Sequence, residues 1–109
     1  MITRNYQTEE LILNKNGLKA SRLYDNPEGE IIHIEIEAGK TLQSHSTPVN
    51  VAFYVIEGEL KIEIGEEKKA CPADTLIESP KDIPHAIHNE SDISARILVI
   101  KMPKPQKRR

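Results

Sequence analysis

Four histidines and one cysteine are the side chains of this 109-residue sequence best suited to chemistry at neutral pH: His33, His45, His85, His88 and Cys71. An imidazole can bind a transition metal or move a proton, because its unperturbed pKa is about 6.5. A cysteine reacts as its thiolate, which Lys68 and Lys69 would favour only if Cys71 were exposed. We expect Cys71 to be a small buried filler, so the histidines are the candidates for a site.

The sequence lacks the short motifs of several common enzyme classes. It contains no glycine-rich phosphate loop, no paired His-Glu helix motif and no nucleophile elbow. The net charge is -2 and both signs are interspersed, which argues against a nucleic-acid partner. The basic tail over residues 103–109 is the exception, and we expect it to be a solvated terminus.

The elements that must position the histidines are short β-strands. Isoleucines at positions 32, 34 and 36 alternate with polar residues at 33, 35 and 37, which predicts a strand with one buried and one wetter face. Similar segments cover residues 51–56, 60–64, 75–78 and 93–101, and turn pairs such as Asn16-Gly17 and Glu57-Gly58 separate them. This pattern predicts an all-β sandwich or barrel.

The same alternation sorts two of the histidines and leaves the N-terminal segment open. His33 falls on the wetter face, where a structural role is expected, and His88 has the opposite parity from His85, so it should point out of the barrel. Residues 8–13 could begin a helix capped by Thr8, or form a β arm that pairs with another subunit. We favour the arm.

From Gly39 onward the sequence resembles the first motif of the cupin family: glycine, five residues, histidine, one, histidine, three or four, glutamate, six, glycine. Gly39 and His45 have that spacing, and Gly58 closes the motif at residues 39–58. Thr47 stands in place of the second histidine and Val51 in place of the glutamate.

The second cupin motif is matched over residues 73–89, and its latter half is retained as Pro80, Asp82, His85 and Asn89. Ala73 replaces the leading glycine. Asp82 replaces a second glycine, which is tolerable because aspartate accepts left-handed backbone angles better than most residues. The resemblance implies one domain over residues 1–109, folded as a double-stranded β-helix, or jelly-roll, barrel with residues 1–10 as an N-terminal arm.

In cupins, three histidines and the glutamate bind one divalent metal, often iron, manganese, nickel or zinc. The resemblance therefore implies that His45 and His85 are the retained metal ligands of a partly degenerate site, with Gln43 as a surrogate third ligand. Two imidazoles alone should hold a metal weakly. Together with the two-residue alternation, the motifs place seven side chains inside the barrel: Gln43, His45, Thr47, Val51, Phe53, His85 and Ile87.

Three functions remain open at this point. The first is binding of a small molecule, uncharged or partly apolar, because Val51 removes a carboxylate from the cavity. The second is a metal-dependent dioxygenase or isomerase that uses His45 and His85. The third is a dimeric, non-enzymatic regulatory module, in which the two histidines are satisfied by hydrogen bonds.

The composition indicates which cellular compartment and which partners to expect. The lone cysteine cannot form an internal disulfide, and residues 1–10 are polar, with no apolar stretch that could act as a signal peptide or span a membrane. We therefore expect a cytoplasmic protein without a membrane partner. A homodimer is expected from the resemblance and from the small size of the core.

Overall fold

The computed structural model describes residues 1–106, which form ten β-strands and no helix. Within these residues, accordingly, no helix is long and apolar enough to cross a bilayer. The strands are β1 Leu11–Lys15, β2 Leu18–Asn26, β3 Gly29–Ile36, β4 Thr41–His45, β5 Asn50–Glu57, β6 Glu59–Ile64, β7 Glu67–Pro72, β8 Leu76–Ser79, β9 His85–His88 and β10 Ala95–Met102.

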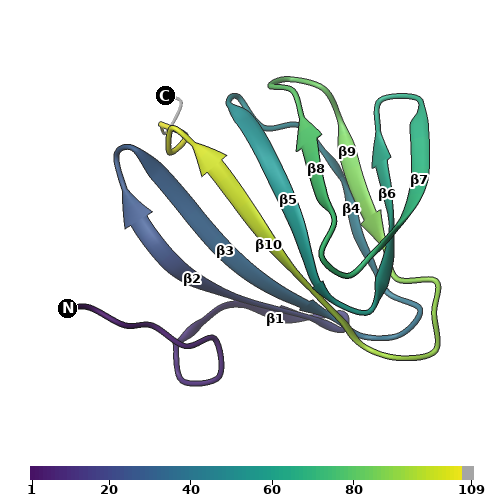
Figure 1. The fold of residues 1–109 in the computed structure, drawn as a ribbon, viewed down its shortest axis with the longest axis horizontal. Coiled ribbons are helices and arrows are strands. Elements are labelled where there is room, and N and C mark those ends of the chain that lie inside the picture. The colour runs from purple at the N-terminus through teal and green to yellow at the C-terminus, as the bar shows by residue number, and fades with distance from the viewer. Residues whose placement is uncertain (107–109) are drawn as a thin grey trace.

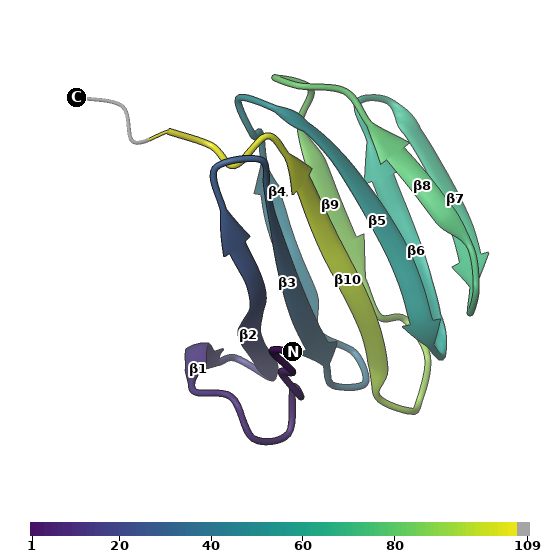
Figure 2. The ribbon, with the colours of Figure 1, turned by 60° about the vertical axis from the view of Figure 1, so that its left-hand side comes forward.

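The strands form two antiparallel sheets that lie face to face (Figure 1). The larger sheet has the order β1-β2-β3-β10-β5-β8, and the smaller sheet has the order β4-β9-β6-β7. The edge strands β7 and β8 lie next to each other at one side of the molecule in Figure 2, and residues of both line one pocket. The predicted all-β jelly-roll architecture is therefore confirmed.

The core forms where the inward-facing residues of neighbouring strands meet in rows. One row across β2, β3, β10 and β5 consists of Ala20, Ile34, Ile97 and Val55, all of which are buried. Burial of a single large aliphatic side chain contributes about 1.5–3 kcal/mol. The alternating isoleucines that predicted β3 thus lie on the face of β3 that packs against the other sheet.

Left-handed residues shape the turns that join these strands. Gly58, at φ 82°, makes the turn between β5 and β6, and a Cβ there would lie 3.0 Å from that of Ala95. Asp82, at φ 64°, adopts the left-handed conformation expected for it in place of glycine. Its amide donates to the Thr47 carbonyl at 2.8 Å, so this turn is tied to the segment after β4.

Asn89 holds together the segments that carry the two motifs. Its side-chain amide donates to the carbonyls of Ile36 at 2.9 Å and Ile93 at 2.8 Å, and the residue is 1% exposed. Its backbone accepts from the Gly39 amide and donates to Lys40. The motif asparagine is therefore a scaffold residue, because it fixes where β4 begins.

β1 pairs with β2 of its own chain and includes residues 11–13 of the expected arm, whereas residues 1–10 form no strand. Residues before it fold back so that the Tyr6 ring stacks on His33, with ring centroids 4.0 Å apart. His33 is on the outer face of β3, but the expectation of a wet environment was wrong, since it is 2% exposed. Arg96 completes the cover, with Nη1 3.1 Å from His33 Nε2.

Candidate functional site

His45 and His85 come from neighbouring strands of the smaller sheet and face each other. His45 is the last residue of β4, His85 is the first of β9, and the two are register partners. Their Nε2 atoms lie 3.3 Å apart, and their rings meet edge to face with centroids 4.6 Å apart. We call these two residues the histidine pair. His85, the inner member, is buried, and His45, the outer member, is exposed to solvent.

A β-bulge in β4 brings His45 to this position. Leu42 pairs with Ile87 and His45 with His85, so β4 carries one more residue between these partners than β9 does. The expectation that Gln43, His45 and Thr47 alternate regularly on one strand face was therefore wrong. Gln43 is exposed, and its contact with the pair is through its backbone carbonyl, 3.1 Å from His45 Nδ1.

His85 is fixed on both ring nitrogens. Ser79 Oγ lies 2.9 Å from Nδ1, and Thr47 Oγ1 lies 3.5 Å from Nε2 on the same side as His45. The ring is 2% exposed, and Phe53 packs edge to face against it with centroids 5.1 Å apart. Burial, and then the neighbouring charges of His45 and Lys101, lower the pKa of His85 to about 4. His85 is therefore a neutral imidazole at pH 7.

The remaining predicted site residues are apolar and lie in the core. Val51, Phe53 and Ile87 are 4%, 1% and 0% exposed. Phe53 alone among them contacts the histidine pair through its ring. Val51, at the position matched to the family glutamate, pairs with Ser79 on β8 and with Lys101 on β10.

Sequence reasoning missed Ser79 and a buried ion cluster on the same row of the larger sheet. Glu30, 5% exposed, pairs with Arg22 at 2.9 Å and with Lys101 at 3.5 Å. Lys101 lies opposite both Glu30 and Val51 in the sheet. Glu30 and Lys101 lie on strands far apart in sequence, β3 and β10, so their contact gives no local pattern, although a glutamate and a lysine at inward parity were a usable signal.

The donor set does not match that of a tight metal centre. Two imidazole nitrogens bound to one tetrahedral ion at about 2.0–2.1 Å would lie roughly 3.3–3.4 Å apart, so the spacing of the pair is compatible with a shared ion. However, residues 1–106 contain no group of three or more histidine, cysteine, aspartate or glutamate side chains that could hold one. Thr47 and Val51 leave two of the four family ligand positions without a strong donor.

The other candidate side chains are placed elsewhere. His88 points away from the barrel interior, as expected, and contacts Thr41 and Glu63 on the smaller sheet at 3.2 and 3.0 Å. Cys71 is a buried member of the core, and desolvation raises the pKa of its thiol, as expected for an inert filler. In the tail, Lys104 forms an ion pair with Asp25, and residues 107–109 lie outside the described part of the chain.

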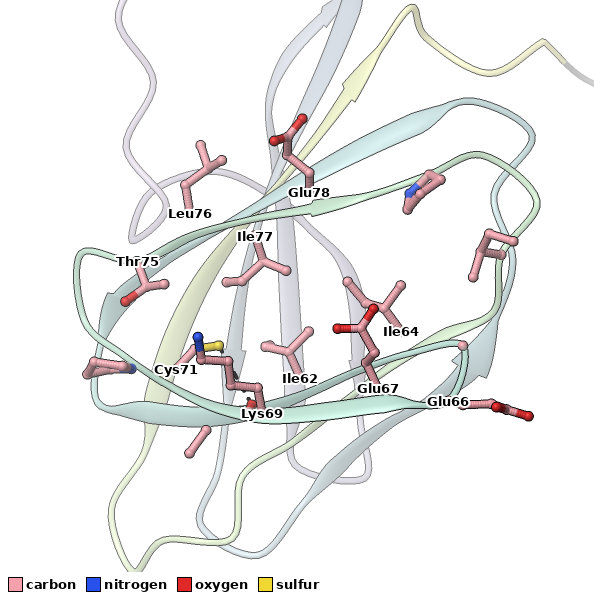
Figure 3. Close-up of a pocket in the computed structure, with 15 residues that line it drawn as sticks. Ile62, Ile64, Glu66, Glu67, Lys69, Cys71, Thr75, Leu76, Ile77 and Glu78 are labelled. Carbon is pink, nitrogen blue, oxygen red and sulfur yellow. Dashed lines mark hydrogen bonds between the residues drawn. The ribbon is translucent and has the colours of Figure 1, made fainter.

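A hollow lies between the edge strands, and the histidine pair does not line it (Figure 3). Its volume is about 870 Å³. Its walls come from β6, β7, β8 and the turn before β9, and include Ile62, Ile64, Cys71, Ile77 and Ile83. We call it the edge pocket.

Comparison with solved structures shows the same fold in proteins of low sequence identity. An RmlC-like cupin from Shewanella frigidimarina superposes with a TM-score of 0.84 at 20% identity, over 94% of this chain and 90% of that one. KdgF from Halomonas sp. gives 0.85 at 13% identity, over 97% and 96%. The polyketide cyclase RemF from Streptomyces resistomycificus gives 0.81 at 16% identity, over 98% and 83%.

At these identities the structural likeness speaks for the fold alone. No curated protein matches the sequence. The family model described as "Cupin domain" matches residues 32–101, which contain both motifs and the histidine pair. This chain belongs to the cupin family.

Proposed function

We propose that this protein binds a small, uncharged and partly apolar molecule at the histidine pair. The observation that carries the proposal is the arrangement of His85, which is buried and held at Nδ1 by Ser79 while its Nε2 faces the exposed His45 at 3.3 Å. A ligand that reaches His45 from solvent meets a fixed hydrogen-bonding group directly behind it.

The charge state of His85 favours a neutral ligand. Because the pKa of His85 is lowered to about 4, the ring offers a neutral hydrogen-bond partner and no positive charge at pH 7. Val51 and Phe53 supply apolar surface behind it. Few polar groups on an apolar wall are typical of small-molecule sites.

Titration with phenol, a neutral aromatic molecule with one hydroxyl group, tests this proposal. We expect the side-chain nitrogen resonances of His45 and His85 to shift, and benzoate, its charged analogue, to bind at least several-fold more weakly. His85→Ala should remove phenol binding, whereas His88→Ala, on the outer face, should leave it unchanged. Equal binding by wild type and His85→Ala would refute the proposal.

Metal-dependent chemistry, as a dioxygenase or isomerase, is the second candidate, and the 3.3 Å spacing of the two Nε2 atoms favours it. Cupins often bind transition metals, and a divalent iron, manganese, nickel or zinc ion would be held here by His45 and His85 with solvent in the remaining positions. Such an ion would act as a Lewis acid. Turnover that survives His85→Ala would exclude this function.

We also propose that the protein is a homodimer, in the cytoplasm, assembled through the outer face of the larger sheet. Ile31, Leu98 and Ile100 are only half-buried there, and Leu76 is 54% exposed. Sedimentation should give a dimer that Ile100→Lys dissociates. If the dimer persists in that variant, another surface must be responsible, and a dimer without any ligand at the histidine pair would favour a regulatory module.

A further inference from the structure

The edge pocket exists because the two sheets do not join along one side. Within residues 1–106, β7 and β8 are the terminal strands of their sheets, with no ladder between them. Figure 3 shows Ile62 and Ile64 behind the gap, with Ile77 pointing into it from β8. A volume of about 870 Å³ is within the range of small-molecule pockets, roughly 300–1,000 Å³.

The floor of the edge pocket is aliphatic and meets solvent. Ile64 and Ile77 are only partly buried, and Ile83, on the turn before β9, is 40% exposed. Cys71 also lines the pocket, and its side chain is buried. Apolar surface that stays in contact with water favours a ligand with an aliphatic body.

Two opposite charges face this aliphatic floor from β7. Glu67, Lys69 and Cys71 share the inward parity of that strand, and Figure 3 shows the Glu67 and Lys69 side chains directed into the gap. Neither is in an ion pair with any part of the chain the structure describes. Their Cα atoms, two positions apart on a strand, are separated by about 6.6 Å.

The neighbours of these residues on β7 and before it behave differently. Lys68, of opposite parity, forms an ion pair with Glu90 at 3.9 Å on the other side of the sheet. Glu66, in the turn before β7, also lines the pocket, but its side chain points away from the gap in Figure 3. Glu67 and Lys69 are thus the charged residues of β7 that share the inward parity of Cys71, and both stay exposed to solvent, where they can meet a ligand.

We propose that the edge pocket binds a small aliphatic zwitterion, with its ammonium group at Glu67, its carboxylate at Lys69 and its methylene chain over Ile62 and Ile77. This site is independent of the histidine pair and of the function proposed for it. The edge strands, with their unpaired backbone groups, form its two rims.

The test uses the full chain with isotope-labelled isoleucine methyl groups and three probes of matched length: ε-aminocaproate, hexylamine and hexanoate. We expect ε-aminocaproate to shift the methyl resonances of Ile62, Ile64 and Ile77. ε-Aminocaproate can form one more exposed charge pair than hexylamine or hexanoate. Because such a pair adds modestly to affinity, its dissociation constant should be roughly fivefold lower than that of either singly charged probe.

Single-charge variants assign the two ends. Glu67→Gln should reduce ε-aminocaproate binding to the level of hexanoate, and Lys69→Gln should reduce it to the level of hexylamine. Glu28→Gln and Lys68→Gln are matched controls, with the same changes of charge on exposed side chains that do not line the pocket, and both should bind like wild type.

Several outcomes would overturn the proposal. They are equal affinity for all three probes, equal effects of the control variants, or an absence of shifts at the three isoleucines. Isoleucine shifts that depend on protein concentration alone would assign the pocket to contact with a second copy of the chain.

Discussion

Val51 lies directly opposite Ser79 in the ladder between β5 and β8, so an apolar side chain stands beside the serine that holds His85. In the family motif this position carries the metal-binding glutamate. The Ser79 hydroxyl, 2.9 Å from Nδ1, orients the His85 ring although no carboxylate stands at residue 51.

The first prediction is that Thr47→His combined with Val51→Glu restores a tight metal site. The double variant would supply the two absent donors from positions already in register. We expect about one equivalent of nickel or zinc per chain after dialysis, measured by elemental analysis, against a small fraction for wild type. Adding His85→Ala to the double variant should abolish retention. A full equivalent held by wild type would contradict the degenerate site.

The second prediction concerns the hydroxyl that anchors His85. Ser79→Ala leaves a buried imidazole nitrogen without its partner, so the free energy of unfolding should fall by about 1–3 kcal/mol. Urea denaturation at pH 7 measures the change. Ser44→Ala, at an exposed position on β4, serves as the control and should stay within about 0.5 kcal/mol of wild type.

The third prediction is an acid-sensitive stability that depends on His33. Burial, and then the Arg96 charge, lower the pKa of His33 to about 4 from its ordinary 6.5. The unfolded chain therefore binds a proton that the folded chain does not, so the contribution to stability is complete above pH 6.5 and is lost as the pH falls toward 4. At pH 4.5 the loss should be about 2.5 kcal/mol.

Urea denaturation of wild type and His33→Gln at pH 7 and pH 4.5 isolates this contribution, because His85 titrates equally in both proteins. The variant should lose less stability than wild type on acidification. The ionisable side chains around His33 belong to five segments of the chain: Tyr6, Glu9, Lys19, Glu35, Arg96 and, through Arg96, Glu57. Equal losses would show that His33 is protonated in the folded state.

The fourth prediction separates backbone strain from steric clash at two glycines. Gly39 and Gly58 both have positive φ, at 77° and 82°, but a Cβ at Gly39 would meet nothing within 4 Å. At Gly58 it would contact Ala95 and the Ser94 carbonyl at 3.0–3.2 Å. Gly39→Ala should cost about 1 kcal/mol and Gly58→Ala at least about 2 kcal/mol, measured by thermal unfolding.

A strand could be predicted from the sequence where apolar residues on its buried face alternate with polar residues on its solvent-facing side. β3, β5, β6 and β10 have continuous aliphatic positions at a period of two, so the expected segments overlap the observed strands closely. β7 was harder to find because Glu67 and Lys69 place charges on its inward face, which removes the alternation. β2 likewise carries polar residues along most of its length.

The candidate site, like the fold, was predicted only in part from the sequence. His45 and His85 were predicted to converge from motif spacing, and the structure brings them within 3.3 Å; whether they bind a ligand remains a prediction. Gln43 was assigned inward by simple alternation, which fails because the β4 bulge adds a residue. Ser79 precedes His85 by six positions on another strand, so its contact follows from tertiary packing alone.

The position of β10 bears on how the chain folds. It is the last strand of the described residues, yet it lies between β3 and β5 at the centre of the larger sheet. Until residue 102 has left the ribosome, the strands on either side have no neighbour to join them, so the larger sheet can form only after synthesis of β10. Because these pairings link distant parts of the chain, we expect slow refolding, on the millisecond-to-second scale of β-sandwiches.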